Sequence, residues 1–247
     1  MRSIEWSARL QHELAVNPYS AFVTLTYNDE NLRYKVLPTL CKPDLQKYHK
    51  RLRKHISYKF YQVGEYGEKY GRPHYHVLMF SSSLIPSKLL KEEWPYGLSH
   101  IGLVESKSVG YVVSYIRKNV KERNALEKLR DNPFMTCSHG LGYGYMVNNK
   151  QAINDQESVR VNGGRTKVPR YYLKKEVFDK VKKSELRIKE EKARYERFVQ
   201  FCIVNGYDED EYKSLRLFSK HEDEEALQCC KNITAKKNLY GGSKNEL

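Results

Sequence analysis

The chain contains Arg72-Pro73-His74-Tyr75-His76-Val77-Leu78-Met79-Phe80, a run of alternating bulky residues that follows a turn rich in glycine. Such a run predicts a β-strand, and side chains two apart on a strand share one face of the sheet. His74 and His76 are therefore expected to converge on one point. Imidazole nitrogens at this spacing suit a divalent metal ion, although histidines also occupy strand positions for packing reasons alone.

The segments around this strand predict an α+β fold. Alternating β-rich runs indicate strands, and apolar residues at intervals of three and four indicate helices. The resulting order of strand, helix, strand, strand, strand, helix is typical of an antiparallel sheet with helices packed on one side. The expected strands are Ala21–Tyr27, Phe60–Val63, His74–Phe80 and Leu98–Glu105, of which the middle two form a hairpin, and the expected helices are Pro43–Ile56 and one that buries Val109, Val112, Val113 and Ile116.

The charge distribution divides the chain after residue 175. The net charge is +14, from 44 basic and 30 acidic residues, and residues 176–247 contain equal numbers of each. We therefore expect a basic domain over residues 1–175 and a charge-balanced helical appendage over residues 176–247, with a helix that ends at Asn205-Gly206 and a flexible tail. The basic excess favours a polyanionic partner, although a merely soluble basic surface fits the charge equally well.

The composition excludes several classes of protein. Five cysteines form no C-x-x-C pair, and their odd number fits poorly with a secreted disulfide scaffold, so a reducing cytosol is expected. No apolar stretch approaches the roughly 20 residues of a membrane helix, and the first residues have no signal-like apolar core. The phosphate-binding loop motif of helicases is absent from the sequence.

Glu65 follows the strand that is expected to pair with the histidine strand. A hairpin would bring its carboxylate to the two imidazoles. Two histidines and one carboxylate leave coordination positions open for a phosphate oxygen, as a catalytic metal ion requires, and such a site accepts Mg²⁺ or Mn²⁺. Glu68, further into the turn, is the competing carboxylate.

Tyr111 and Tyr115 lie four residues apart on the second expected helix, and Lys118 lies three residues beyond. Residues at these spacings share one helix face, so all three can reach one site. A tyrosine can attack a phosphodiester once its phenol loses its proton, and a nearby ammonium group favours the phenolate form. The helix alone is a weak signal because the chain contains 20 tyrosines.

Taken together, these residues resemble the HUH endonucleases, and more narrowly the rolling-circle replication initiators of microviruses, especially the gokushovirus branch. The resemblance covers residues 20–175. It rests on the β-rich strand Phe22–Tyr27, the hairpin with Glu65, His74 and His76, and the helix with two tyrosines, in that order. The segment Asn162–Tyr172 is similar to the signature that follows the catalytic helix in the family, and Asn162-Gly163-Gly164 within it predicts a β-hairpin.

The resemblance implies a ferredoxin-like or RRM-like nuclease fold and an origin-specific, metal-dependent nickase. Such an enzyme cuts single-stranded DNA at the viral origin, stays attached to the 5′ end through a phosphotyrosine, and later rejoins the strand. The free 3′-hydroxyl primes a host DNA polymerase, assisted by a host helicase, in the cytoplasm of the bacterial host cell. Glu65 corresponds to the third metal ligand of the family. Paired tyrosines imply nucleophiles that alternate, and Tyr115 is expected to cut first because Lys118 is nearest to it in helical spacing.

Two further groups of residues are candidates for contact with DNA. The helix Pro43–Ile56 has a basic face that suits the phosphate backbone, and an aromatic pair beside an arginine suits stacking on unpaired bases. The candidates are Lys47, Lys50, Arg51 and Lys54 on the helix, and Arg170, Tyr171 and Tyr172 further along the chain.

Three other functions stay open at this point. A transposase or relaxase of the same nuclease group is disfavoured by the paired tyrosines and by the lack of a long C-terminal region. A non-catalytic basic protein that binds single-stranded nucleic acid would use its histidines only for packing. A zinc hydrolase that acts through water is disfavoured because it usually shows additional cysteine or histidine ligands.

Overall fold

The structure is a computed structural model that describes residues 2–32, 36–67, 71–118, 128–175, 177–210 and 214–225, without the side chains of residues 2, 116–118 and 180. It divides into two compact units, Met1–Val177 and Phe178–Leu247. The boundary lies two residues beyond the one predicted from the charge distribution.

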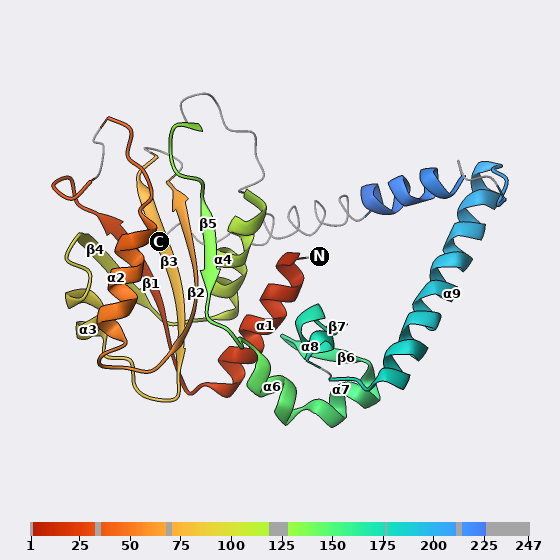
Figure 1. Cartoon of the computed structure of the whole chain (residues 1–247), viewed down its shortest axis with the longest axis horizontal. Coiled ribbons are helices and arrows are strands. Elements are labelled where there is room, and N and C mark those ends of the chain that lie inside the picture. Colours follow the sequence, from red (N-terminus) through yellow and green to blue (C-terminus); the bar gives the residue numbers. More distant parts are fainter. Residues whose placement is uncertain are drawn as a thin grey trace, which may run out of the picture. The chain divides into compact units, whose positions relative to one another are not determined.

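The first unit is built on a five-stranded antiparallel sheet with the strand order β4-β1-β3-β2-β5 (Figure 1). Helix α2 (Lys42–Leu52) connects β1 to β2, and α3 (Ser87–Glu92) connects β3 to β4. The first four strands and these two helices form a ferredoxin-like β-α-β-β-α-β arrangement, and β5 extends it beside β2. The predicted α+β class and the predicted hairpin are confirmed. The strands are β1 (Tyr19–Tyr27), β2 (Lys59–Tyr66), β3 (Pro73–Ser81), β4 (Gly97–Gly102) and β5 (Phe134–Cys137).

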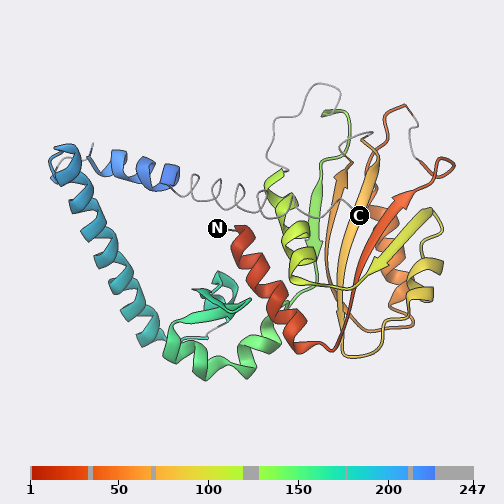
Figure 2. The ribbon, with the colours of Figure 1, turned by 180° about the vertical axis from the view of Figure 1, so that it is seen from behind.

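Helices cover both faces of this sheet rather than the single face expected. The central strand β3 explains the difference because its alternate side chains are apolar in both directions. Tyr75, Val77 and Met79 pack with α2 and α3, whereas Leu78 and Phe80 pack with α1 (Arg2–Val16) and α4 (Ser106–Lys118). Figures 1 and 2 show α2 and α3 on the opposite side of the sheet from α1 and α4.

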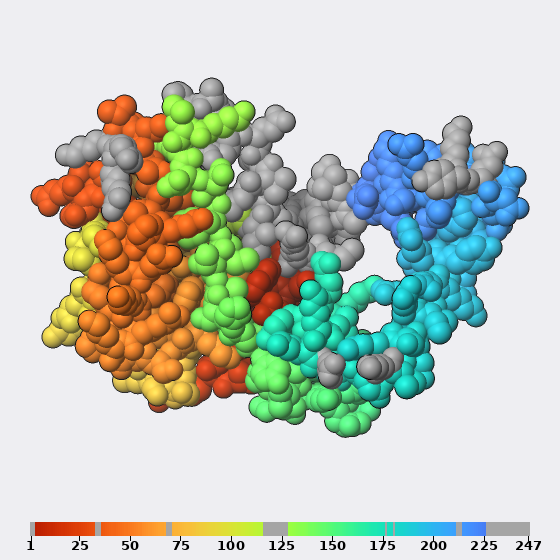
Figure 3. Space-filling model, viewed as in Figure 1, coloured from red at the N-terminus to blue at the C-terminus, as the bar shows by residue number. Residues whose placement is uncertain are grey.

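The rest of the first unit is a set of short elements that follow β5. They include the predicted hairpin, whose turn residues Asn162 and Gly163 have φ values of 50° and 80°, as a two-residue turn of this type requires. In Figure 3 the segment that includes this hairpin lies at the surface beside α1. The elements are α6 (Tyr143–Asn148), α7 (Lys150–Gln156), β6 (Ser158–Val161), β7 (Gly164–Lys167) and α8 (Arg170–Lys174).

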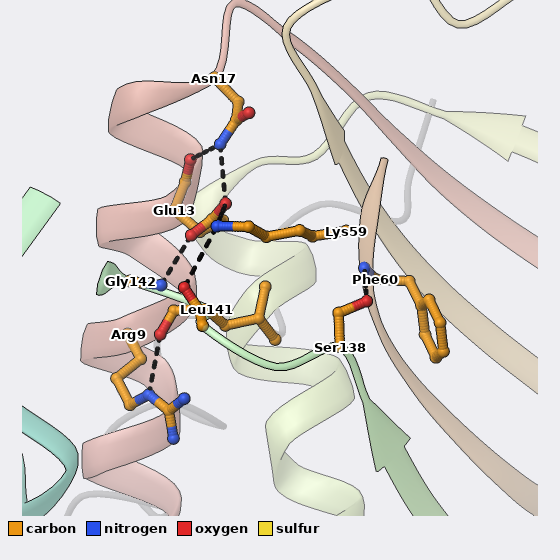
Figure 4. A network of polar contacts seen from close by, with 9 residues as sticks. Arg9, Glu13, Asn17, Lys59, Phe60, Ser138, Leu141 and Gly142 are labelled. Atoms are coloured by element: carbon orange, nitrogen blue, oxygen red, sulfur yellow. Dashed lines mark hydrogen bonds and ion pairs between the residues drawn. The ribbon is translucent and has the colours of Figure 1, made fainter. Parts of the chain in front are cut away.

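Helix α1, which the sequence analysis did not predict, is held by a buried carboxylate (Figure 4). Glu13 is 1% exposed, and its oxygens lie 2.9 Å from the Lys59 ammonium nitrogen and 2.6 Å from the Gly142 backbone nitrogen, which donates to it. Asn17 donates a further hydrogen bond to this carboxylate, at 3.0 Å. Because the charge is both paired and hydrogen-bonded, its burial is tolerated, and it joins α1 to β2 and to the loop after β5.

The second unit consists of α9 (Lys180–Asn205) and a helix over the described residues 214–225. Asp179 caps α9 through the Lys182 backbone nitrogen, and Gly206 ends it with a φ of 67°, as predicted. Phe198, Cys202 and Phe218 form its small core. No helix in the described part of the chain is long and apolar enough to cross a membrane. The predicted flexible tail lies outside the described residues.

Candidate active site

The β2–β3 hairpin and helix α4 together form one pocket. In the hairpin register Glu65 lies directly opposite His74, and His76 is two residues further along the same strand. Glu65, His74 and His76 line the pocket with Tyr111 and Tyr115 of α4. The structure thus brings together five of the six residues that the sequence singled out for metal binding and catalysis.

His76 lies between a carboxylate and a hydroxyl group. Its Nε2 atom is 2.9 Å from Glu65 Oε1, and its Nδ1 atom is 3.1 Å from Thr24 Oγ1. A carboxylate only accepts, so Nε2 carries the hydrogen in this arrangement. The ring stacks on Tyr115, with centroids 5.6 Å apart, so its orientation is fixed by contacts on three sides.

His74 uses one ring nitrogen within the fold and presents the other for binding. Its Nδ1 atom donates to the carbonyl oxygen of Arg72 at 2.7 Å, because a carbonyl oxygen can only accept. The lone pair is therefore at Nε2, the tautomer that metal-binding histidines commonly adopt. Gly67 leaves room for the ring, since a Cβ atom there would lie 3.0 Å from His74 Cε1.

The two tyrosines of the pocket differ in accessibility. Tyr111 is 46% exposed, whereas Tyr115 is 5% exposed. The Tyr115 hydroxyl donates a 2.5 Å hydrogen bond to the Tyr111 hydroxyl. Burial raises the pKa of the Tyr115 phenol far above its usual range, and its hydrogen bonds to Tyr111 and Glu65 raise it further. Tyr115 is therefore a buried hydrogen-bond donor, and Tyr111 faces solvent.

The donor set of the pocket fits a divalent cation, since two imidazoles and one carboxylate are ligands that Mn²⁺ and Mg²⁺ accept in open sites. Among the described residues, however, no group of three or more histidine, cysteine, aspartate or glutamate side chains is already gathered as metal ligands. Glu65 and His76 instead bond to each other, at 2.9 Å. The pocket has the right ligands in metal-free contacts.

Two residues predicted near this site cannot be placed. Lys118 ends α4, but its side chain is outside the described part of the structure, and Glu68 also lies outside the described residues. One residue was missed: Thr24 of β1 lies opposite His76 in the sheet register. The alternation of β1 contained the signal, because a strand paired with the histidine strand must present every second residue to the same face.

The basic helix face is partly available. Lys47, Lys50 and Lys54 are exposed. Arg51, in contrast, donates to Glu93 Oε2 at 2.9 Å and to the Glu93 carbonyl oxygen at 2.6 Å, so it joins α2 to the end of α3. Arg51 therefore has a structural use that the sequence did not indicate.

The Arg170–Tyr172 group is also used within the fold. Tyr172 is 0% exposed, and its hydroxyl lies 2.8 Å from His12 Nδ1. It offers no ring face to a base, which corrects the prediction that it stacks on DNA. Arg170 pairs with Glu5 at 2.9 Å, and the Arg9 guanidinium covers the Tyr171 ring at 4.0 Å from its centroid. Two adjacent tyrosines look alike in sequence, and only packing against α1 separates them.

Comparisons with known proteins agree on one family. Residues 20–120 match the family model of the phage replication-associated protein ORF2. The chain is 31% identical over 243 residues to the replication-associated protein ORF2 of Spiroplasma virus 4, covering 85% of this chain and 75% of that protein. It is 25% identical to the replication-associated protein ORF4 of Chlamydia phage 1 and 27% identical to the replication-associated protein VP4 of Bdellovibrio phage phiMH2K, covering 69% and 68% of this chain.

The chain spans 49% of the Chlamydia phage protein and 61% of the Bdellovibrio phage protein. Among solved structures, the hypothetical protein ORF119 of Sulfolobus islandicus rod-shaped virus 1 matches with a TM-score of 0.34 and 19% identity, over 47% of this chain and 94% of that one. The family model covers the strand, hairpin and tyrosine helix that build the pocket. The chain therefore belongs to the family of replication-associated proteins of microviruses.

Proposed function

We propose that this replication-associated protein initiates rolling-circle replication by nicking and rejoining one DNA strand at the viral origin. One observation carries the proposal: metal-type ligands and two tyrosine hydroxyls line a single pocket. Family membership supports the replication role, and the pocket supports the chemistry. The protein would act in the cytoplasm of the bacterial host, where a host helicase and DNA polymerase extend the nicked strand.

Glu65, His74 and His76 would hold the metal ion, Mg²⁺ or Mn²⁺. When bound, such an ion polarises a phosphoryl oxygen and neutralises charge that develops on it. The Nδ1 contact of His74 with Arg72 already leaves Nε2 directed to ligand binding. For His76, Thr24 Oγ1 supplies the acceptor that Nδ1 needs once Nε2 no longer carries the hydrogen.

Tyr111 is the nucleophile of the first cut in this proposal. Its phenol oxygen forms a bond to the phosphorus, the bond from phosphorus to the 3′-oxygen breaks, and the proton released by the phenol is balanced by the one that the leaving 3′-hydroxyl gains. The Tyr115 hydroxyl donates to the Tyr111 oxygen at 2.5 Å and stabilises negative charge there during the attack.

This assignment reverses the expectation from helical spacing, which favoured Tyr115. Exposure decides it, because a scissile phosphate can approach a phenol that is 46% exposed and cannot approach one that is 5% exposed without movement of α4. Tyr115 would attack in the second round, after Tyr111 is occupied by the DNA 5′ end and their contact is broken.

The experiment uses labelled single-stranded oligonucleotides that tile the viral strand, with Mn²⁺ or Mg²⁺, followed by denaturing electrophoresis and mapping of the phosphotyrosine peptide. The wild type should give an adduct at Tyr111. Tyr111→Phe should lower adduct formation more than Tyr115→Phe, and the double variant should form none. Oligonucleotide binding without any adduct would contradict the proposal and favour a non-catalytic binding protein. An adduct confined to Tyr115 would reverse the order of the nucleophiles.

A further inference from the structure

The β6–β7 hairpin places two arginines directly opposite each other. Arg160 and Arg165 are register partners, and both are exposed. Within the described part of the chain, neither side chain takes part in an ion pair. Lys167 lies two residues from Arg165 and so on the same face, whereas Val159 on the other face is buried at 2% exposure. The hairpin thus buries an apolar face and presents a basic one.

A cross-strand pair of like charges is unfavourable by itself. Side chains directly opposite in an antiparallel pair have Cβ atoms about 4.5–5.5 Å apart, and like charges at that distance repel. Arg170, three residues beyond the hairpin, is instead neutralised by Glu5 at 2.9 Å. A phosphate would remove the repulsion between Arg160 and Arg165, and the planar guanidinium group matches phosphate oxygens with two parallel hydrogen bonds.

The hairpin is fixed to the helix that carries the tyrosines. The Asn162 side-chain oxygen, at the tip, accepts a 3.0 Å hydrogen bond from Ser106, the first residue of α4. The Arg160 carbonyl oxygen accepts from His12 Nε2 at 2.9 Å, which ties β6 to α1. Tyr111 lies five residues after Ser106, about 7.5 Å along the helix axis. The basic face therefore belongs to the same rigid group of elements as the pocket.

We propose that the exposed face of the β6–β7 hairpin binds backbone phosphates of the DNA strand that enters the pocket, with Arg160 and Arg165 as the two phosphate ligands. This inference rests on the proposed function for the identity of the polyanion. The surface position of the hairpin beside α1 is visible in Figure 3.

The test compares two double variants with the same change in charge. Arg160→Gln/Arg165→Gln removes the hairpin pair, and Lys47→Gln/Lys50→Gln removes two exposed charges from α2, across the sheet from α4. Binding of full-length protein to a labelled single-stranded oligonucleotide, and separately to a duplex, is measured against NaCl concentration with EDTA present. Thermal melting reports folding.

For the hairpin variant we expect at least tenfold weaker single-strand binding at low salt and a log–log salt slope shallower by about 1.4, since each phosphate contact adds about 0.7 for single strands. Its melting temperature should not fall, because a repulsive pair has been removed. The α2 variant should change the slope less, and Arg160→Lys/Arg165→Lys should restore most of it.

An unchanged slope in the folded hairpin variant would overturn the inference, and so would an equal loss in the α2 variant. A loss confined to the duplex would show that the hairpin contacts double-stranded DNA and not the strand in the pocket. Because binding is measured without metal, these results do not depend on nicking. A protein that forms no adduct but loses salt dependence in the hairpin variant would contradict the proposed function alone.

Discussion

Each face of the sheet brings together two tyrosine hydroxyls and one carboxylate, but only one of these clusters is open. Under α2, the Tyr27 hydroxyl donates to Asp44 Oδ2 at 2.9 Å and lies 3.0 Å from the Tyr75 hydroxyl. Tyr27 is 2% exposed and Tyr75 is 0% exposed. Under α4, Tyr111, Tyr115 and Glu65 form the corresponding set, and Tyr111 faces the solvent.

The difference lies in what closes each cluster. The Tyr75 hydroxyl also accepts from the Cys41 backbone nitrogen at 2.7 Å, so the sealed cluster supports the backbone just before α2 begins. Burial raises the pKa of both Tyr27 and Tyr75 above the usual range of a phenol. The same three chemical groups thus stabilise the fold when they are sealed, and are available to a substrate when one of them is exposed.

The largest expected effect comes from the metal ligands of the open cluster. His74→Ala or His76→Ala should lower nicking by on the order of 10³-fold or more, with Glu65→Ala severely impaired, because the phosphoryl oxygen is then no longer polarised. DNA binding should be largely kept, since it depends on contacts between basic residues and phosphates. His100→Ala, which changes an exposed histidine of β4, is the matched control. Metal-dependent nicking by His74→Ala/His76→Ala would contradict the assignment of this pocket.

A smaller effect is expected at Thr24, which contacts His76 Nδ1 at 3.1 Å. Thr24→Val removes the acceptor that orients the imidazole, and loss of such a partner typically weakens metal binding about 10–100-fold. The measurement is the rise in melting temperature with Mn²⁺ concentration. Thr26→Val, on the same strand face opposite His74, is the control. Equal Mn²⁺ dependence in both variants would show that Thr24 does not position the ligand.

The sealed cluster should respond in stability and not in activity. Tyr27→Phe deletes a hydrogen bond to a buried carboxylate, which typically costs about 1.5–3 kcal/mol. Urea unfolding should show this loss, while nicking per folded molecule stays at the wild-type level. Tyr111→Phe should give the opposite result, with little change in unfolding and a large loss of adduct. If Tyr27→Phe also lowered the nicking rate of folded protein, the two faces would be coupled.

A pH effect is expected from His49, on the α2 side of the sheet. Burial lowers the pKa of His49 from 6.5 to about 4, and its ring bonds to Tyr58 and Gln62. The unfolded chain therefore binds a proton between these two values that the folded chain does not, so stability falls as pH drops below about 6.5. The loss from this group should reach about 2 kcal/mol at pH 5. Comparison of urea unfolding at pH 7 and pH 5 for wild type and His49→Gln checks this, since the variant should lose less. Equal losses would assign the acid sensitivity to other groups.

The sequence by itself determined the parts of the fold and site that depend on local periodicity. Alternation placed His74 and His76 on one strand face, and the hairpin brought Glu65 opposite His74. A spacing of four placed Tyr111 and Tyr115 on one helix face. The φ values that Asn162 and Gly163 can adopt determined the β6–β7 turn. These features follow from backbone geometry, which is set within a few residues.

Only the tertiary structure decided which of these side chains are covered. Helix α1 is held in place through contacts such as Glu13 with Gly142, 129 positions apart, and no local pattern encodes such a contact. The same kind of packing buries Tyr172 under His12 and Tyr115 against His76, while it leaves Tyr111 exposed. Periodicity fixes the direction in which a side chain points, but burial depends on what distant segments place there, and burial is what separates the exposed tyrosine from the sealed ones.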